Sequence, residues 1–270
     1  YAALLHDFGK VGVREHVLVK ANKLYPQQLD LLESRFECAK LSCKHGHAEQ
    51  RIEVLAPRGL DEAAAQALQR IAADESRSLE ELTEFWNFIL QCNKPTVIVE
   101  GSFDRLRGIA ERNFTGSNGM QNDLLREDEL LSLSIPRGTL TDDERNQIED
   151  HVVHTYNFLR QIPWTRDLAN VPDIAHRHHE KLNGRGYPAQ LGPASIPVQS
   201  RIMTIVDIYD ALTASDRPYK SAVPHDRAMT ILGFECDAGA ICPELLQLFH
   251  EARPWERLAT TATERMKMPS

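Results

Sequence analysis

The sequence lacks any long hydrophobic segment. Its 270 residues contain no run of about 18 apolar residues, which is the length that a membrane-spanning helix requires. No signal peptide is visible either, so we expect no membrane segment in this chain. The chain begins at Tyr1, inside the apolar run of residues 1–5, and we expect it to be a fragment that lacks an N-terminal part and any sensory domain.

Cysteine is also scarce. The five cysteines are an odd number and do not show the spacing of a disulfide framework. Cys38 and Cys43 lie close together, but no second pair accompanies them, which argues against a zinc finger. Reduced thiols in the cytoplasm fit this pattern best.

An excess of positive charge is missing too. Lys and Arg number 31 against 39 Asp and Glu, which gives a net charge of −8 at pH 7. This balance argues against a protein that coats DNA or RNA, but it allows a small anionic ligand held by metals and a few nearby cations. With 42% hydrophobic and 26% charged residues, the composition is that of an ordinary globular protein with one large domain or two small ones.

The sequence does have a dense group of metal-binding and turn-forming residues at 176–188, HRHHEKLNGRGYP. On a predicted helix over 171–181, His178 and His179 point about 100° apart and can reach two metals, or one metal from two sides. The glycines and Pro188 after them end the helix and hold Tyr187 in a tight loop beside whatever the histidines bind. A polar helix end followed by a turn is the alternative interpretation.

A second group lies near the start of the chain. Residues 1–8 are typical of the end of an apolar helix, and this end carries His6 and Asp7. A carboxylate can bridge two metals, and an imidazole is a good ligand for iron, manganese or zinc. Such a pair is common by chance, but Lys10 follows three residues after Asp7 and can contact a phosphate oxygen.

A third group lies on a predicted helix at residues 197–215. Asp207 and Asp210 are three residues apart on one face, among several isoleucines. A partly buried carboxylate is costly unless it is paired or binds a metal, so this helix is a further candidate source of a ligand.

The segment 37–135 carries little chemistry. After an amphipathic helix at 24–36, we predict a loop at 113–122 and helices at 37–55, 60–74, 79–92, 102–112 and 123–132. His45 and His47 have no adjacent carboxylate residue in the sequence and are interpreted as solvent-exposed.

The helix that begins near Leu140 repeats the pattern of the one that begins at Leu24. Only the later copy has a histidine, His151, where the earlier copy has Arg35. An arginine side chain stays protonated and cannot bind a metal, so the later copy is predicted to supply the ligand. His154, on roughly the same face, is the rival candidate.

Together these motifs resemble the HD-GYP phosphodiesterases, a branch of the HD phosphohydrolase superfamily. The resemblance covers residues 1–36 and 136–250. It is carried by an ordered set of motifs: His6-Asp7-Phe8-Gly9-Lys10, His151, His178-His179-Glu180, Gly186-Tyr187-Pro188, the segment 206–213 (VDIYDALT) and Arg217-Pro218-Tyr219-Lys220.

The resemblance implies an all-α fold, an HD-type helical bundle with a binuclear or trinuclear site. Two or three divalent metal ions, usually iron or manganese, would act in the hydrolysis of cyclic di-GMP, a bacterial second messenger, to pGpG or GMP. Residues 1–36 and 136–250 would form the catalytic core, residues 37–135 a helical insertion and residues 251–270 a C-terminal tail. The insertion would serve homodimerisation or signal input, and a sensory domain or a diguanylate cyclase would be the partner.

Carried over residue by residue, the resemblance also assigns roles. The metal ligands would be His6, Asp7, His151, His178, His179 and Asp207. Asp7 would bridge the metals and, with Lys10, would be catalytic. Contacts to the phosphates would come from Lys10, Arg217 and Lys220, and the substrate-side loop would be Gly186, Tyr187 and Pro188.

Two other functions compete with this one. The first is a catalytically silent module that binds signalling partners, which has no need to keep six ligands. The second is another HD-type nucleotide phosphohydrolase, against which the segments 186–188 and 217–220 argue.

Overall fold

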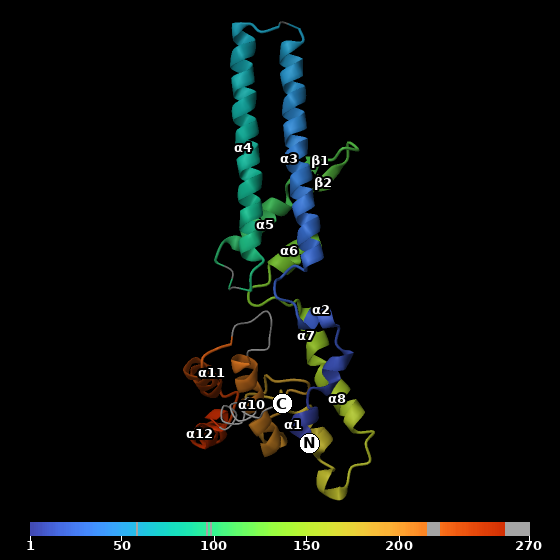
Figure 1. Ribbon diagram of the computed structural model, residues 1–270, viewed down its shortest axis with the longest axis vertical. Coiled ribbons are helices and arrows are strands. Elements are labelled where there is room, and N and C mark those ends of the chain that lie inside the picture. Colours follow the sequence, from blue (N-terminus) through green and yellow to red (C-terminus); the bar gives the residue numbers. More distant parts are fainter. Residues whose placement is uncertain (58, 96, 98, 215–221, 257–270) are drawn as a thin grey trace, which may run out of the picture. The chain divides into compact units, whose positions relative to one another are not determined.

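The computed structural model describes residues 1–57, 59–95, 97, 99–214 and 222–256 (Figure 1). These residues fall into two compact units. Unit 1 joins Tyr1–Val19 to Glu144–Ser270, and unit 2 is Lys20–Asp143. Helices dominate both units, which confirms the predicted all-α fold. Among the described residues, no helix is both long enough and apolar enough to cross a membrane.

Unit 1 is built from short helices and 3-10 turns. Its N-terminal elements are α1 (Ala2–Leu5), η1 (Phe8–Gly12) and α2 (Glu15–Leu18). After α7 (Asp142–Glu149), which spans the junction with unit 2, the unit continues with α8 (His151–Leu159), η2 (Arg166–Leu168), α9 (Val171–His176), η3 (Pro193–Ser195), α10 (Val198–Thr213), α11 (His225–Asp237) and α12 (Pro243–Ala252).

The N-terminal elements are fastened to α8 and α9. The buried hydroxyl of Thr155 on α8 donates a hydrogen bond to the carbonyl of His6 (2.9 Å) and accepts one from the backbone N–H of Gly9 (2.8 Å). Below this junction, Leu159, Val171 and Ala175 form a small hydrophobic core against which α1 packs. A residue from the middle of α8 therefore fixes the backbone that carries His6 and Asp7.

At Gly9 the N-terminal backbone lies directly against the backbone of α8. A Cβ atom added there would lie 2.0 Å from the carbonyl oxygen of His151 and 2.6 Å from the backbone nitrogen of Thr155. Gly9→Ala is therefore expected to destabilise unit 1 by about 1–3 kcal/mol, because backbone atoms must move to make room. Thermal unfolding followed by circular dichroism measures the effect.

Gly233→Ala is the matched control for this substitution. Gly233 lies inside α11 of the same unit, and an added Cβ would meet no atom within 4 Å. Alanine should stabilise that position by up to about 1 kcal/mol, from helix propensity. Equal effects of the two substitutions would contradict the steric account of Gly9.

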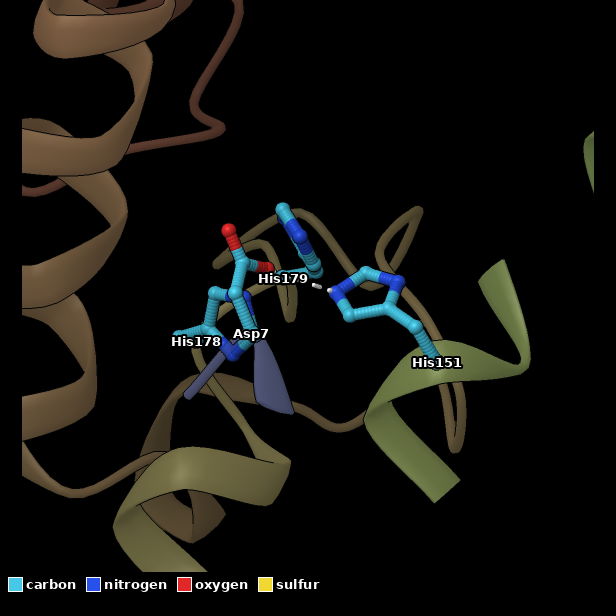
Figure 2. Close-up of side chains that lie close together, drawn as sticks. All are labelled: Asp7, His151, His178 and His179. Atoms are coloured by element: carbon cyan, nitrogen blue, oxygen red, sulfur yellow. Dashed lines mark ion pairs between the residues drawn. The ribbon is translucent and has the colours of Figure 1, made fainter. Parts of the chain in front are cut away.

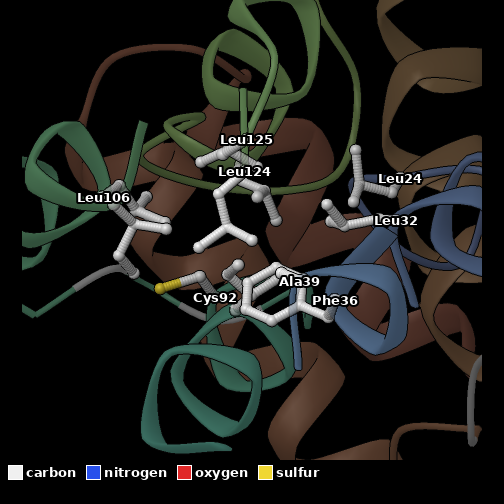
Figure 3. Close-up of a cluster of buried hydrophobic side chains, with 11 residues drawn as sticks. Leu24, Leu32, Phe36, Ala39, Cys92, Leu106, Leu124 and Leu125 are labelled. Atoms are coloured by element: carbon white, nitrogen blue, oxygen red, sulfur yellow. The ribbon is translucent and has the colours of Figure 1, made fainter. Parts of the chain in front are cut away.

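Unit 2 is a long helical hairpin with smaller elements at one end. Figure 1 shows α3 (Pro26–Leu55) and α4 (Glu62–Cys92) side by side. The other elements are α5 (Ser102–Ala110), the antiparallel strands β1 (Asn113–Thr115) and β2 (Gln121–Asp123), and α6 (Glu127–Leu133). Their shared hydrophobic core lies where α3 begins and α4 ends, and it includes Leu32, Phe36, Ile89, Leu106 and Leu125 (Figure 3).

The two ends of unit 2 lie close together. The hydroxyl of Thr139 donates a hydrogen bond to the carbonyl of Lys20 (3.2 Å), and the buried ammonium of Lys23 donates one to the carbonyl of Leu133 (3.2 Å). The chain therefore enters and leaves this unit at one place.

Several predicted helix boundaries are wrong. The helices predicted at 24–36 and 37–55 are one helix, α3, and those predicted at 60–74 and 79–92 are one helix, α4. No glycine or proline interrupts residues 74–79, so the helix continues through them. The predicted loop at 113–122 contains β1 and β2.

The units also divide at other places than the predicted domains. The boundary predicted at 36/37 falls inside α3, whose start packs into the core of unit 2. The earlier copy of the repeated helix thus belongs to the hairpin. The predicted tail at 251–270 begins too early, since α12 runs to Ala252 and the ring of Trp255 lies 4.3 Å from that of His225.

Candidate metal centre

The six predicted metal ligands come together in unit 1. They form two groups that share Asp7, and within each group the candidate ligand atoms lie within 4.8 Å of one another. The first group is Asp7, His151, His178 and His179, and the second is His6, Asp7 and Asp207. Figure 2 shows the side chains of the first group pointing toward a common centre.

Asp7 occupies the middle of the arrangement. Its Oδ1 atom lies 3.2 Å from Nε2 of His151, and its Oδ2 atom lies 3.5 Å from Nε2 of His6. The same His6 nitrogen is 3.6 Å from Oδ1 of Asp207, whose Oδ2 is 3.9 Å from Nδ1 of His179. A carboxylate with one oxygen facing each side is the geometry that a bridging ligand needs.

Backbone hydrogen bonds orient three of the histidines in the same way. In each, Nδ1 bonds to a carbonyl three residues earlier: His6 to Ala3 (2.8 Å), His151 to Ile148 (2.5 Å) and His178 to Ala175 (2.6 Å). A carbonyl only accepts, so each Nδ1 carries the proton. The lone pair of Nε2 is thereby available to a metal.

Four buried atoms at the centre have no hydrogen-bond partner among the described residues. They are Nε2 of His6, Oδ1 of Asp7, Nε2 of His151 and Nε2 of His178. Leaving several polar atoms unpaired in one buried place is costly unless something else satisfies them. The donor set of imidazoles and carboxylates, without a thiolate, fits divalent metals such as iron or manganese.

Charges in the site favour the ligand forms of these residues. Burial alone would raise the pKa of Asp7, but the nearby His151 and the hydrogen-bonded ammonium of Lys10 outweigh it and hold the pKa well below its usual range. Burial lowers the pKa of His178 to about 4 and also lowers that of His179. At neutral pH Asp7 is therefore ionised and His178 and His179 are neutral, which are the forms that bind a metal.

The two adjacent histidines lie in a turn, and the predicted helix over 171–181 is wrong at its end. Helix α9 stops at His176. The carbonyl of His178 accepts a hydrogen bond from Thr204 on α10 (2.6 Å), and that of His179 accepts one from the backbone N–H of Tyr187 (3.2 Å). These outside donors replace the hydrogen bonds that a continuing helix would make.

The loop after the histidines is held by Glu180. Its buried carboxylate accepts hydrogen bonds from the backbone N–H groups of Ala189 (2.7 Å) and Leu191 (2.8 Å). Gly186 permits the tight return, because a Cβ there would lie 2.3 Å from the backbone nitrogen of Lys181. The loop contains a cis peptide bond between Tyr187 and Pro188.

Tyr187 and Lys10 lie at the edge of the centre. The ring of Tyr187 stacks on that of His179, with centroids 4.7 Å apart and planes 27° apart. The ammonium of Lys10 is 2.6 Å from Oδ2 of Asp7. Of the other predicted phosphate contacts, Arg217 and Lys220 lie outside the described residues.

The rival candidates lie elsewhere. His154 faces Gly12, where an added Cβ would be 3.4 Å from its ring, and it is not among the clustered ligands. Asp210 is exposed on α10. His45 is exposed in unit 2 as predicted, but His47 is buried, since Nδ1 bonds to the carbonyl of Cys43 (2.7 Å) and Nε2 lies 3.3 Å from Asp74.

Sequence reasoning missed the residues that position the ligands. Thr155 holds the backbone of His6, and Thr204 holds that of His178. Hydroxyl residues inside helices give no distinctive sequence pattern, because their partners are far away along the chain. Glu180 belongs to a motif that the sequence analysis quoted, but only the folded structure shows that its carboxylate holds the loop.

The sequence of this chain is similar to those of several known proteins. Residues 128–240 match the profile of the HD domain family. Over 105 residues, 37% of this chain and 21% of the relative, the sequence is 39% identical to a cyclic di-GMP phosphodiesterase of Vibrio cholerae serotype O1. Over 95 residues, 35% of this chain and 20% of the relative, it is 38% identical to a 3'3'-cGAMP-specific phosphodiesterase 3 of the same organism.

A third relative is the cyclic di-GMP phosphodiesterase response regulator RpfG of Xanthomonas campestris pv. campestris. It is 38% identical over 101 residues, 37% of this chain and 26% of the relative. The chain therefore spans about a fifth to a quarter of the length of these relatives. Residues 128–240 are thus similar to HD domains, and the resemblance to the HD-GYP phosphodiesterases that the motifs indicated is confirmed.

Proposed function

We propose that this chain hydrolyses cyclic di-GMP to pGpG, GMP or both, using two or three divalent metal ions. The observation that carries the proposal is the convergence of four unpaired buried atoms, from His6, Asp7, His151 and His178, on one centre. The similarity to cyclic dinucleotide phosphodiesterases supports the choice of substrate. Iron or manganese suits the imidazole and carboxylate ligands.

The residues of the site have separable tasks in this proposal. His6, Asp7, His151, His178, His179 and Asp207 would hold the metals. When bound, a pair of divalent metals lowers the pKa of a water and neutralises the charge that develops on a phosphodiester. Tyr187 covers one side of His179 and, with Gly186 and Pro188, would bound the substrate. Lys10 would contact a phosphate oxygen, as would Arg217 and Lys220.

The setting of the activity is part of the proposal. All five cysteines are unpaired, which suits the reducing cytoplasm. The long hairpin of α3 and α4 would form a homodimer or receive a signal from a sensory domain or a diguanylate cyclase. In this role it would supply none of the metal ligands, which all belong to unit 1.

Metal analysis combined with product analysis tests the function. Protein purified without oxygen is expected to hold two or three iron or manganese ions per chain and to convert cyclic di-GMP to linear products that chromatography resolves. A protein that binds metals and the nucleotide without turnover would instead be a silent binding module.

Lys10→Ala is expected to lower the rate while the metals stay bound. A charge-assisted hydrogen bond to a phosphate is worth about 1.5–3 kcal/mol, or roughly 10- to 100-fold in kcat/KM. Metal content per chain and kcat/KM for cyclic di-GMP are measured together. Loss of metal would show that Lys10 acts through its 2.6 Å contact with Asp7, and would contradict the phosphate role.

Lys181→Ala is the control for the loss of a lysine. Lys181 lies in the same unit, and its ammonium pairs with Glu235 on α11 (2.8 Å). Its removal should change neither metal content nor rate by more than about twofold, as expected for a partly exposed ion pair.

A further inference from the structure

A polar pocket opens beside the candidate metal centre. It has a volume of about 310 Å³, and its lining includes Asn146, Glu149, Asp150, Arg185, Tyr187 and Gln190. Tyr187 connects the two places, because its ring lines the pocket and stacks on His179. A substrate whose phosphate reaches the metal ligands would therefore bring its adjoining part to this pocket.

Three charged residues line the pocket, and two of them with opposite sign, Glu149 and Arg185, do not pair with each other. Among the residues that the structure describes, neither the carboxylate of Glu149 nor the guanidinium of Arg185 takes part in a hydrogen bond or an ion pair. Glu149 is half-buried on α7, and Arg185 stands in the loop before Tyr187. Burial and, after it, the negative charge of Glu149 raise the pKa of Tyr187, which agrees with Glu149 lying near that ring.

We propose that this pocket selects a guanine base, with Glu149 and Arg185 as its specificity-determining residues. The inference rests on the proposed function, since it concerns a base of the same cyclic dinucleotide. Guanine presents two neighbouring donors, N1–H and the N2 amino group, which one carboxylate can accept together. On its other edges it presents O6 and N7, which an arginine contacts with two parallel hydrogen bonds.

Adenine does not match these groups. Its N1 is an acceptor and would face the carboxylate of Glu149, and its N6 amino group would face the guanidinium of Arg185. Two acceptors, or two donors, that face each other form no hydrogen bond, so adenine should bind more weakly than guanine. The pocket should therefore accept substrates that carry at least one guanine and reject cyclic di-AMP.

Cyclic di-IMP tests whether Glu149 binds the N2 amino group of guanine. Hypoxanthine keeps N1–H, O6 and N7 but lacks the N2 amino group. The parent protein should therefore prefer cyclic di-GMP to cyclic di-IMP by about tenfold or more in kcat/KM. In Glu149→Gln this preference should fall to about twofold, because the amide has one acceptor where the carboxylate has two.

Arg185→Ala should behave differently. Both bases present O6 and N7, so loss of the guanidinium should weaken cyclic di-GMP and cyclic di-IMP by similar factors of about tenfold. Asp143→Asn is the matched control, because Asp143 is an exposed acid on the same helix as Glu149 and does not line the pocket. It should leave all ratios unchanged.

A base-free substrate separates this inference from the proposed function. Bis(p-nitrophenyl) phosphate has no base, so its hydrolysis and the metal content should stay within about twofold of the parent in all three variants. Equal turnover of cyclic di-AMP and cyclic di-GMP, or an unchanged preference in Glu149→Gln, would overturn the guanine pocket while the phosphodiesterase stands.

Calorimetric binding decides the question even without turnover. If metal-loaded protein hydrolyses neither the dinucleotide nor bis(p-nitrophenyl) phosphate, the proposed function fails. The affinities for cyclic di-GMP, cyclic di-IMP and cyclic di-AMP then still report base selection. Equal affinities for the three nucleotides would refute base selection. Tightest binding of cyclic di-GMP in the parent, with a smaller preference over cyclic di-IMP in Glu149→Gln, would support it.

Discussion

Replacing Asp7 with alanine is expected to remove metal from the centre and to lower phosphodiester hydrolysis at least about a hundredfold. Asp7 belongs to both ligand groups, and its two oxygens face different histidines. Loss of a partner that only orients a ligand already costs roughly 10- to 100-fold in metal affinity or activity. Loss of a shared carboxylate should cost more, because both metal positions lose a ligand.

The measurement is metal content per chain beside the rate on cyclic di-GMP. Asp210→Ala is the matched control, since Asp210 is an exposed acid three residues after Asp207 on α10. It should keep the metal and the rate. If Asp7→Ala kept both as well, Asp7 would not be a bridging ligand.

His151→Ala should likewise remove at least one metal and most of the activity, whereas His154→Ala should do neither. His151 is almost completely buried, its Nδ1 is fixed by the carbonyl of Ile148, and its Nε2 faces Asp7. His154 lies one turn further along α8 against Gly12. The two substitutions remove the same chemical group from one helix, so a difference between them reports position alone.

Two controls sharpen this comparison. His45→Ala and His47→Ala change histidines of unit 2 and should leave metal content unchanged, although His47→Ala removes a buried group and should lower the stability of the hairpin. Thermal unfolding of His151→Ala shows whether unit 1 remains folded. Metal loss in His154→Ala with full metal in His151→Ala would mean that the register of α8 is wrong by one turn.

The sequence indicated which side chains lie together in the candidate metal centre, because the patterns that mark them are local. His6 beside Asp7, and His178 beside His179, are neighbouring candidate ligands followed by turn-forming residues, and Asp207 is an acid among apolar residues. The all-α fold was implied by the resemblance to the HD-GYP phosphodiesterases, and periodicity indicated several of the individual helices. The choice of His151 over His154 came from comparing two similar segments, although the earlier of these, around Leu24, lies in the hairpin.

Other features depend on distances that no local pattern contains. Thr155 meets His6 and Gly9 only after α8 has packed on η1, and Glu180 meets Ala189 and Leu191 only when the loop has closed. The lengths of α3 and α4 were missed for another reason. Residues 74–78 are polar and free of glycine and proline, so packing between the two helices decides whether the helix continues.

The hydrogen bond from Thr139 to Lys20 joins the two ends of unit 2, so this unit is an insertion whose ends meet. A segment whose two ends meet can be removed, lengthened or exchanged if a short connection replaces it, since closing a short loop costs little entropy. The segments of unit 1 that hold the clustered histidines and aspartates then keep their positions. Changes in the length or sequence of the hairpin can therefore accumulate without disturbing that cluster.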